Sequence, residues 1–233
     1  MKEQVGAVGR QATSPPESPA IMVLLSAGRM STYLRATGGD RVQAMRLYAW
    51  NVEASAAMWG DFSVLEVCVR NAMSRQLELH AGQVDWWDSP TVTLCVEQLQ
   101  TLQRAASALG HQGQQASAGH IVANLTLGFW TSLLANRYHQ RLWEPAIKKA
   151  FPHLKGRRGA LQQDLEALRR LRNRIAHHEP IFNRDLATDH ETVLSVLAMI
   201  EPAARAWLTS NSRIIPVLAA RADTVTGMRP TSF

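Results

Sequence analysis

Residues 161–184 read LQQDLEALRRLRNRIAHHEPIFNR, and most of this stretch has the pattern of one amphipathic helix. Its large apolar residues recur every three or four positions, which is the spacing of a helical turn, so they share one face. They are Leu161, Leu165, Leu168, Leu171 and Ile175. In a continuing helix the ring of Pro180 would clash with the Ala176 carbonyl. The stretch therefore predicts a helix with one buried face that ends or distorts in its last turn.

Arg172 interrupts that apolar face. On a helical wheel of about 100° per residue it lies roughly 20° from Leu161. A guanidinium stays charged and is costly to bury unpaired, so this position requires a carboxylate, a phosphate or a polar cleft beside it. Asn173, His177 and His178 follow toward the end of the helix. An arginine, an asparagine and two histidines at one helix end are more typical of a functional site than of a core.

The chain has 233 residues and a formal net charge of +6, and most of the excess lies in one segment. Residues 155–184 contain eight basic and three acidic side chains. A local basic surface indicates a polyanionic partner, with RNA or DNA favoured over a membrane. The alternative is a basic helix face that only contacts solvent.

Cys68 and Cys95 lie in apolar helical contexts. We interpret them as buried thiols in a reducing compartment rather than as a disulfide or metal ligands. No apolar run is long enough to span a bilayer, and residues 21–25 lack the basic start and cleavage pattern of a signal peptide. The sequence predicts a cytoplasmic protein with no metal or other cofactor.

Helical patterns follow one another along the chain, and alternating strand patterns are absent. Residues 1–20 are expected to be a disordered tail, and residues 21–233 a single helical domain. The predicted fold class is all-α, a bundle of roughly eight helices. The main expected helices cover residues 26–36, 40–80 (one bent helix, or two that meet at Gly60), 92–109, 121–134, 143–151, the basic stretch, 191–200, 202–208 and 213–222. The DWWDSP segment at 85–90 is expected to be a loop, and its Trp86 and Trp87 have no assigned chemistry.

Four stretches, in order, resemble the Abi-like proteins, bacterial abortive-infection proteins within the HEPN superfamily of helical RNases. They are LYAWN with LEVCVRNAM (47–51 and 65–73), HIVANLTLGFW (120–130), LRNRIAHHEPIFNR (171–184) and a helical C-terminal third. The resemblance covers residues 26–222 and implies a HEPN-like bundle that dimerises. It also implies a catalytic arginine, often followed by a polar residue, with a histidine after four to six intervening residues. Arg172, Asn173 and His177 match this pattern, and His178 also fits the spacing.

The arginine–histidine spacing alone is a weak signal, because it occurs six times in this chain. Only the pairs that begin at Arg172 combine the following asparagine, the apolar-face position and the helix-ending proline. The pair Arg75 and His80 lies on an otherwise ordinary helix, and we interpret it as surface.

Cleavage of RNA without a metal needs a base for the 2′-OH proton, an acid for the leaving 5′ oxygen and a cation on the phosphate. Histidine suits proton transfer near neutral pH, and a fixed arginine stabilises phosphoryl charge. We assign Arg172 to the phosphate, His177 to proton transfer, and Asn173 to orienting the histidine or the phosphate. His178 is either the catalytic histidine or a last-turn cation favoured by the helix dipole. The expected product is a 2′,3′-cyclic phosphate, and DNA should not be cut.

Arg172 and His177 lie about 140° apart on an ideal helix, so one protomer brings them together poorly. A two-fold dimer that pairs two such segments is the preferred arrangement. A structural salt bridge from Arg172 to Glu66 is the alternative. Glu66, Arg70 and Asn71 are the candidate supporting residues, with Glu66 pairing either Arg70 on the surface or a buried arginine. The arginines assigned to RNA contact are Arg169, Arg170, Arg174 and Arg184.

Two functions follow from these assignments. One is a HEPN-type endoribonuclease, a toxin that halts the growth of a phage-infected cell. The other is a catalytically silent helical module that binds a structured RNA or a protein through the basic helix. The expected partners are an RNA substrate, a regulatory structured RNA, an antitoxin or inhibitor, and a second copy of the chain.

Overall fold

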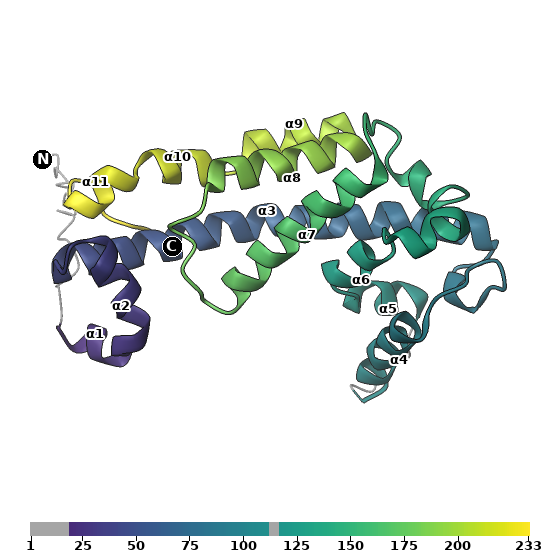
Figure 1. Ribbon diagram of the computed structural model, residues 1–233, viewed down its shortest axis with the longest axis horizontal. Coiled ribbons are helices and arrows are strands. Elements are labelled where there is room, and N and C mark those ends of the chain that lie inside the picture. The colour runs from purple at the N-terminus through teal and green to yellow at the C-terminus, as the bar shows by residue number, and fades with distance from the viewer. Residues whose placement is uncertain (1–18, 112–116) are drawn as a thin grey trace, which may run out of the picture. The chain divides into compact units, whose positions relative to one another are not determined.

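The computed structural model describes residues 19–111 and 117–233, and this part of the chain is helical without β-strands (Figure 1). It contains eleven α-helices and several short 3-10 and π-helical turns. The all-α prediction is confirmed, but roughly eight helices was too few, because two predicted helices are each divided into shorter ones. The predicted disordered tail lies outside the described residues except at Pro19 and Ala20. Helix α1 (Pro19–Leu24) begins at these two residues.

The chain divides into two compact units. One consists of the residues up to Ala54 together with Pro216–Phe233, and the other is Ser55–Ile215. The single domain expected over 21–233 stays a prediction. Helix α3 (Arg41–Ala81) contributes to both units and continues through Gly60, so this segment is one helix. Its start is capped as the sequence suggests, because Asp40 Oδ1 accepts the backbone N–H groups of the first turn at 2.9 and 3.0 Å.

The first unit contains α1, α2 (Ala27–Ala36), the start of α3 and α11 (Arg221–Thr226). Arg229 forms a two-pronged ion pair with the buried Glu53, at 3.0 and 2.7 Å. The indole N–H of Trp50 donates to the Val217 carbonyl at 2.9 Å. These contacts fasten the C-terminal segment to the start of α3.

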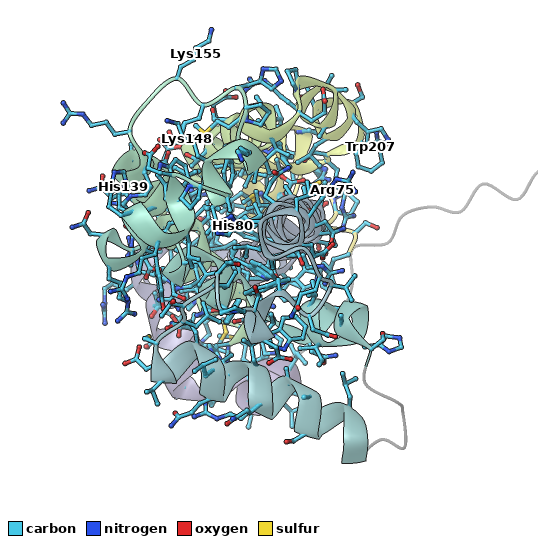
Figure 2. All side chains as sticks on the ribbon, turned by 90° about the vertical axis from the view of Figure 1, so that its right-hand side faces the viewer. Arg75, His80, His139, Lys148, Lys155 and Trp207 are labelled. Atoms are coloured by element: carbon cyan, nitrogen blue, oxygen red, sulfur yellow. The ribbon has the colours of Figure 1, made fainter. Side chains whose placement is uncertain are left out.

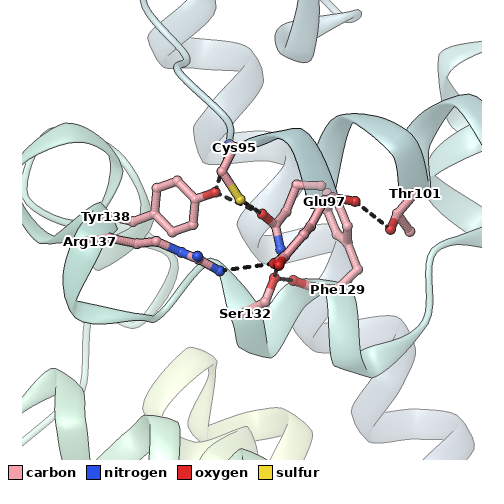
Figure 3. A network of polar contacts seen from close by, with 8 residues as sticks. Cys95, Glu97, Thr101, Phe129, Ser132, Arg137 and Tyr138 are labelled. Atoms are coloured by element: carbon pink, nitrogen blue, oxygen red, sulfur yellow. Dashed lines mark hydrogen bonds and ion pairs between the residues drawn. The ribbon is translucent and has the colours of Figure 1, made fainter.

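Within the second unit, α4 (Val96–His111) begins four residues later than the sequence pattern suggests. A polar network fixes that start (Figure 3). The Cys95 N–H donates to the Tyr138 hydroxyl at 3.0 Å, and that hydroxyl donates to Gln98 Oε1 at 3.0 Å. The Gln98 amide then donates to the Ser132 hydroxyl at 3.0 Å. Because Tyr138 and Ser132 are distant in sequence from Cys95 and Gln98, no local pattern indicates that the helix begins at Val96.

Cys68 and Cys95 are both free thiols, and both are half-buried rather than buried as predicted. Burial raises the pKa of the Cys68 thiol. Partial burial also acts to raise the pKa of the Cys95 thiol, but hydrogen bonds from Tyr138 and from the backbone of Gln98 outweigh it, so this pKa is lowered. The two thiols therefore differ in chemical environment despite their similar exposure.

The predicted apolar helix over 121–134 is divided into α5 (Ala118–Asn124) and α6 (Leu127–Ser132), because Leu125 and Thr126 are extended. Trp86 is fully buried in the short turn η1 (Trp86–Asp88), packs against Phe129 and Trp130, and donates its N–H to Ser74 at 3.2 Å. Trp86 is therefore a core residue of the second unit.

The remainder of the second unit surrounds α7 (Arg158–Ala176), which buries all five of the apolar residues predicted for it. The short turns η2 (Asn136–Tyr138), η3 (His139–Trp143) and η4 (Ile147–Ala150) precede it, in place of one helix over 143–151. Helices α8 (Leu186–Ile200) and α9 (Pro202–Asn211) follow and lie side by side (Figure 1). The last predicted helix is divided into α10 (Ile214–Ala219) and α11. None of the described helices combines the length and apolar character needed to cross a bilayer.

Candidate functional site

The C-terminal end of α7 forms a specific backbone cap. The N–H of His178 donates to the Ile175 carbonyl at 2.9 Å, and the N–H of Glu179 donates to the Arg174 carbonyl at 2.8 Å. This pair of bonds is the Schellman arrangement, which usually places glycine where His178 stands. His178 accordingly adopts φ 56°, in the left-handed region. For a residue with a Cβ this conformation costs about 1 kcal/mol, so His178 stores strain beside the candidate site.

Both histidines of the motif lie at the protein surface. His177 is the C-cap residue of α7, and His177 and His178 are exposed. Asn173, one turn earlier, is half-buried and its carbonyl accepts the His177 N–H at 2.9 Å. The motif thus presents two imidazoles at an open helix end.

Arg172 lies on the side of α7 that faces α3. Its Nε donates to Glu66 Oε1 at 2.7 Å, and its guanidinium lies over the Trp59 ring, 5.0 Å from the centroid. The side chains of Arg172 and Glu66 are 27% and 23% exposed. The counter-charge that the sequence required is therefore Glu66, in a partly solvated setting.

Glu66 engages only one of the five N–H donors of the guanidinium. Within the described residues, the four N–H groups on Nη1 and Nη2 of Arg172 make no hydrogen bond. The ion pair through Nε and the contact with Trp59 fix the plane of the guanidinium, and they leave its two-pronged end available to an anion.

The other two supporting residues do not join this ion pair. Arg70 donates from Nη1 to the Ala123 carbonyl at 3.1 Å and from Nε to Asn71 Oδ1 at 3.3 Å. Of the two alternatives left open for Glu66, the structure has it paired with the arginine of α7. Arg70 instead connects α3 to α5.

Most of the arginines assigned to RNA contact are paired with nearby carboxylates. Arg169 binds Glu166 through two hydrogen bonds of 2.8 and 2.6 Å. Arg184 binds Asp189 in the same way, at 3.0 and 2.7 Å. Hydrogen bonding to these carboxylates raises the pKa of both guanidiniums, and the bond from Arg169 lowers the pKa of Glu166.

Arg174 and Arg170 complete that set. Arg174 lies 3.4 Å from Glu179 and also donates to the Pro180 carbonyl. Arg170 is the most exposed of the four, at 61%, with a long 3.5 Å contact to Glu166. Three of these four arginines thus lie close to a carboxylate and the fourth makes a long contact to one, and contact of these arginines with RNA stays a prediction.

Two features of this region were missed from sequence. Trp59 precedes Glu66 by seven residues, so both lie on one face of α3, and this spacing could have revealed the pair that holds Arg172. Asp61 and His190 form a buried contact of 2.8 Å between α3 and α8. Nothing in the local sequence of either residue indicates that pairing.

The structure does not bring the catalytic candidates together within one chain. Among the described residues, Arg172 contacts Glu66 and Trp59 and neither histidine. In the same part of the chain, no three histidine, cysteine or acidic side chains gather as ligands for a metal ion. The arrangement offers an oriented guanidinium and exposed imidazoles on different sides of one helix end.

Comparisons with models of known protein families, with curated proteins and with solved structures give no match for this chain.

Proposed function

We propose that this protein is a metal-independent endoribonuclease of the HEPN type, acting in the bacterial cytoplasm as an abortive-infection toxin. Arg172 binds the scissile phosphate, His177 transfers protons, and Asn173 orients the histidine. One observation carries this proposal: Arg172 is held through Nε by Glu66, while its Nη groups make no hydrogen bond in the described residues and its side chain remains partly exposed.

The chemistry follows from that arrangement. A guanidinium fixed by one edge can donate two parallel N–H bonds to phosphoryl oxygens without first losing side-chain entropy. These two bonds stabilise the negative charge that develops on the phosphate as the 2′ oxygen attacks and the 5′ oxygen leaves. An exposed imidazole can take the 2′-OH proton near neutral pH, and an imidazolium can give a proton to the leaving 5′ oxygen. Glu66 and Trp59 are positioning residues in this account.

The proposal includes a homodimer, since Arg172 and His177 do not meet within one chain. An apolar surface supports this arrangement. Val67 of α3 and Trp207 of α9, the latter 57% exposed, border a cavity of about 500 Å³. Figure 2 shows Trp207 directed away from the helices. Trp59, which contacts Arg172, is also an exposed apolar side chain of α3. Burying these side chains against a second copy would place the dimer contact beside the candidate site.

A non-catalytic module that binds a structured RNA or a protein is the second candidate. The observation that favours it is the Arg172–Glu66 ion pair itself, because a purely structural arginine would be satisfied by that partner. An antitoxin or a regulatory RNA would hold the toxin silent in the first case, and would be the main ligand in the second.

The test incubates the purified chain with total RNA in EDTA and maps the new ends. We expect 2′,3′-cyclic phosphate ends. Arg172→Ala and His177→Ala should each slow cleavage by about 100-fold or more, the usual loss for such a group. Retention of cleavage by His177→Ala and its loss in His178→Ala would instead assign the proton transfer to His178.

A matched control is available, because Arg75 and His80 have the same spacing on α3 (Figure 2). The double variant Arg75→Ala/His80→Ala should cleave at the wild-type rate. An Arg172→Ala variant as active as the wild type, or a folded wild-type protein that leaves RNA intact, would contradict the proposed nuclease.

A further inference from the structure

A second cationic region lies at the opposite end of α7. A cavity of about 920 Å³ is formed there by η3, η4 and the start of α7. Four permanent cations line it against one carboxylate, Glu144. The cations are Lys148, Lys149, Arg157 and Arg158. Figure 2 shows Lys148 near His139, a further lining residue, and Lys155 projecting from the loop that follows. The cavity is therefore a concentrated positive site.

The single carboxylate is shared between two groups. Glu144 lies 3.3 Å from Lys148 Nζ and 3.7 Å from His139 Nε2. Lys149 and Arg157 are exposed and, within the described residues, form no ion pair. Their charges are thus available to a ligand, whereas most of the arginines at the other end of α7 are occupied.

Two polar atoms of lining residues are buried without a hydrogen-bond partner, namely Arg158 Nε and His139 Nδ1. The rest of the Arg158 guanidinium is fixed, since it donates to the Leu134 carbonyl and, at 3.2 Å, to Asn136 and Gln162. Buried polar groups in proteins are normally hydrogen-bonded. A polar ligand in the cavity could supply hydrogen-bond partners for polar groups of these two lining residues.

The residues that line the cavity indicate which kind of ligand it would bind. Trp143, Phe151 and Leu154 supply an apolar side, and the lysines and Arg157 supply the charge. The first N–H groups of α7 add positive potential at the same place, where Arg157 caps the helix without a side-chain hydrogen bond. A phosphate ester with an attached apolar group matches both sides.

We propose that this cavity is the main site that binds the backbone phosphates of a single RNA strand, in place of Arg169, Arg174 and Arg184 near His177. The inference rests on the proposed function for its choice of RNA. A strand that reaches from Arg157 to His177 spans about 30 Å along α7, at about 1.5 Å per residue. The ligand is accordingly an oligonucleotide rather than one nucleotide.

The test measures binding by fluorescence anisotropy of a labelled single-stranded RNA of about 20 nucleotides, with the full chain carrying Arg172→Ala to prevent cleavage. The triple variant Lys148→Gln/Lys149→Gln/Arg157→Gln is added to it. We expect at least a tenfold weaker affinity at about 100 mM salt. The slope of log K against log salt should fall by about 2, since each contact with a single strand contributes about 0.7.

The matched control removes three exposed arginines from elsewhere in the same unit, as Arg75→Gln/Arg104→Gln/Arg213→Gln. It should lose no more than about twofold in affinity. Equal losses in the two triple variants, or no loss in the cavity variant, would overturn the inference. Displacement of the labelled RNA by ATP at concentrations as low as those needed of unlabelled RNA would overturn the assignment to RNA.

These experiments distinguish a failure of the nuclease proposal from a failure of the cavity assignment. If RNA binds through the cavity but is never cleaved, the nuclease proposal fails and the cavity assignment stands. If RNA is cleaved and the cavity variant binds it normally, only the cavity assignment fails. Circular dichroism of each variant establishes that it is folded.

Discussion

At the C-terminal end of α7 the arginines face carboxylates, whereas at its N-terminal end lysines and arginines surround a cavity with one carboxylate. Arg169 and Arg184 each donate to an acidic side chain within 3.0 Å. Lys149 and Arg157 form no ion pair in the part of the chain that the structure describes. A count of basic residues therefore does not locate a binding surface, because neighbouring carboxylates neutralise part of the positive charge.

The difference has a simple origin in spacing. Glu166 precedes Arg169 by three residues on one helix, and Asp189 follows Arg184 by five across the start of α8. Side chains three or four apart on a helix are neighbours, so the first pair forms locally. The turns before α7 and its first residue contribute four cations to the cavity, and Glu144 is the only carboxylate among its lining residues.

The largest effect expected from this contrast concerns Arg184. Arg184→Ala leaves the Asp189 carboxylate, 12% exposed, without its partner. We expect a loss of about 2–3 kcal/mol in the free energy of unfolding, near the lower end for breaking a buried pair. Lys149→Ala, at the other end of α7, should change it by less than about 0.5 kcal/mol. Urea denaturation measures the free energy of unfolding of both variants. Equal losses in the two variants would contradict the distinction between the two ends of α7.

A smaller effect of opposite sign is expected at the helix cap. His178→Gly relieves the left-handed strain and should raise the free energy of unfolding by about 0.5–1 kcal/mol, after the greater freedom of glycine in the unfolded chain is allowed for. His177→Gly is the control, because His177 has φ −91° and gains nothing from glycine. Thermal unfolding followed by circular dichroism compares the two. A destabilised His178→Gly would show that the imidazole itself supports the fold.

The smallest effect is a pH dependence at the paired end. Hydrogen bonding to Arg169 lowers the pKa of Glu166 in the folded state. A lowered pKa contributes stability above the unfolded value, near 4.3, and this contribution is lost as the pH falls through the folded pKa. For a partly exposed, solvent-screened pair it amounts to about 0.5 kcal/mol.

Glu166→Gln tests that dependence. The variant should be less stable than the wild type at pH 7, and the two should converge near pH 3. Urea midpoints at both pH values provide the measurement. A difference that persists at pH 3 would show that packing, rather than charge, explains the role of Glu166.

The sequence predicted regular helices well and their interruptions poorly. Asp40 and Ser26 are capping residues, and the helices after them begin where expected. The start of α4 and the division of 121–134 into α5 and α6 depend on contacts that no local pattern contains, such as Tyr138 with Cys95. A local cap does not always reveal a helix end, because α8 begins after its cap Asp185, five residues before the expected start at 191. Ends that depend on a distant partner have no local pattern at all.

The candidate site shows the same division. The apolar face of α7, the arginine that interrupts it and the helix end before Pro180 all follow from the sequence, because helical periodicity and the proline ring act locally. The sequence left Glu66 open as a partner of Arg172. Tertiary structure decided for that pair, added the contact with Trp59, and gave His178 its left-handed conformation. It alone also decided which cations remain unpaired, since ion pairs such as Arg172–Glu66 join residues 106 positions apart. The sequence determines which side chains are charged, but the fold determines which carboxylate lies close enough to each cation to neutralise it.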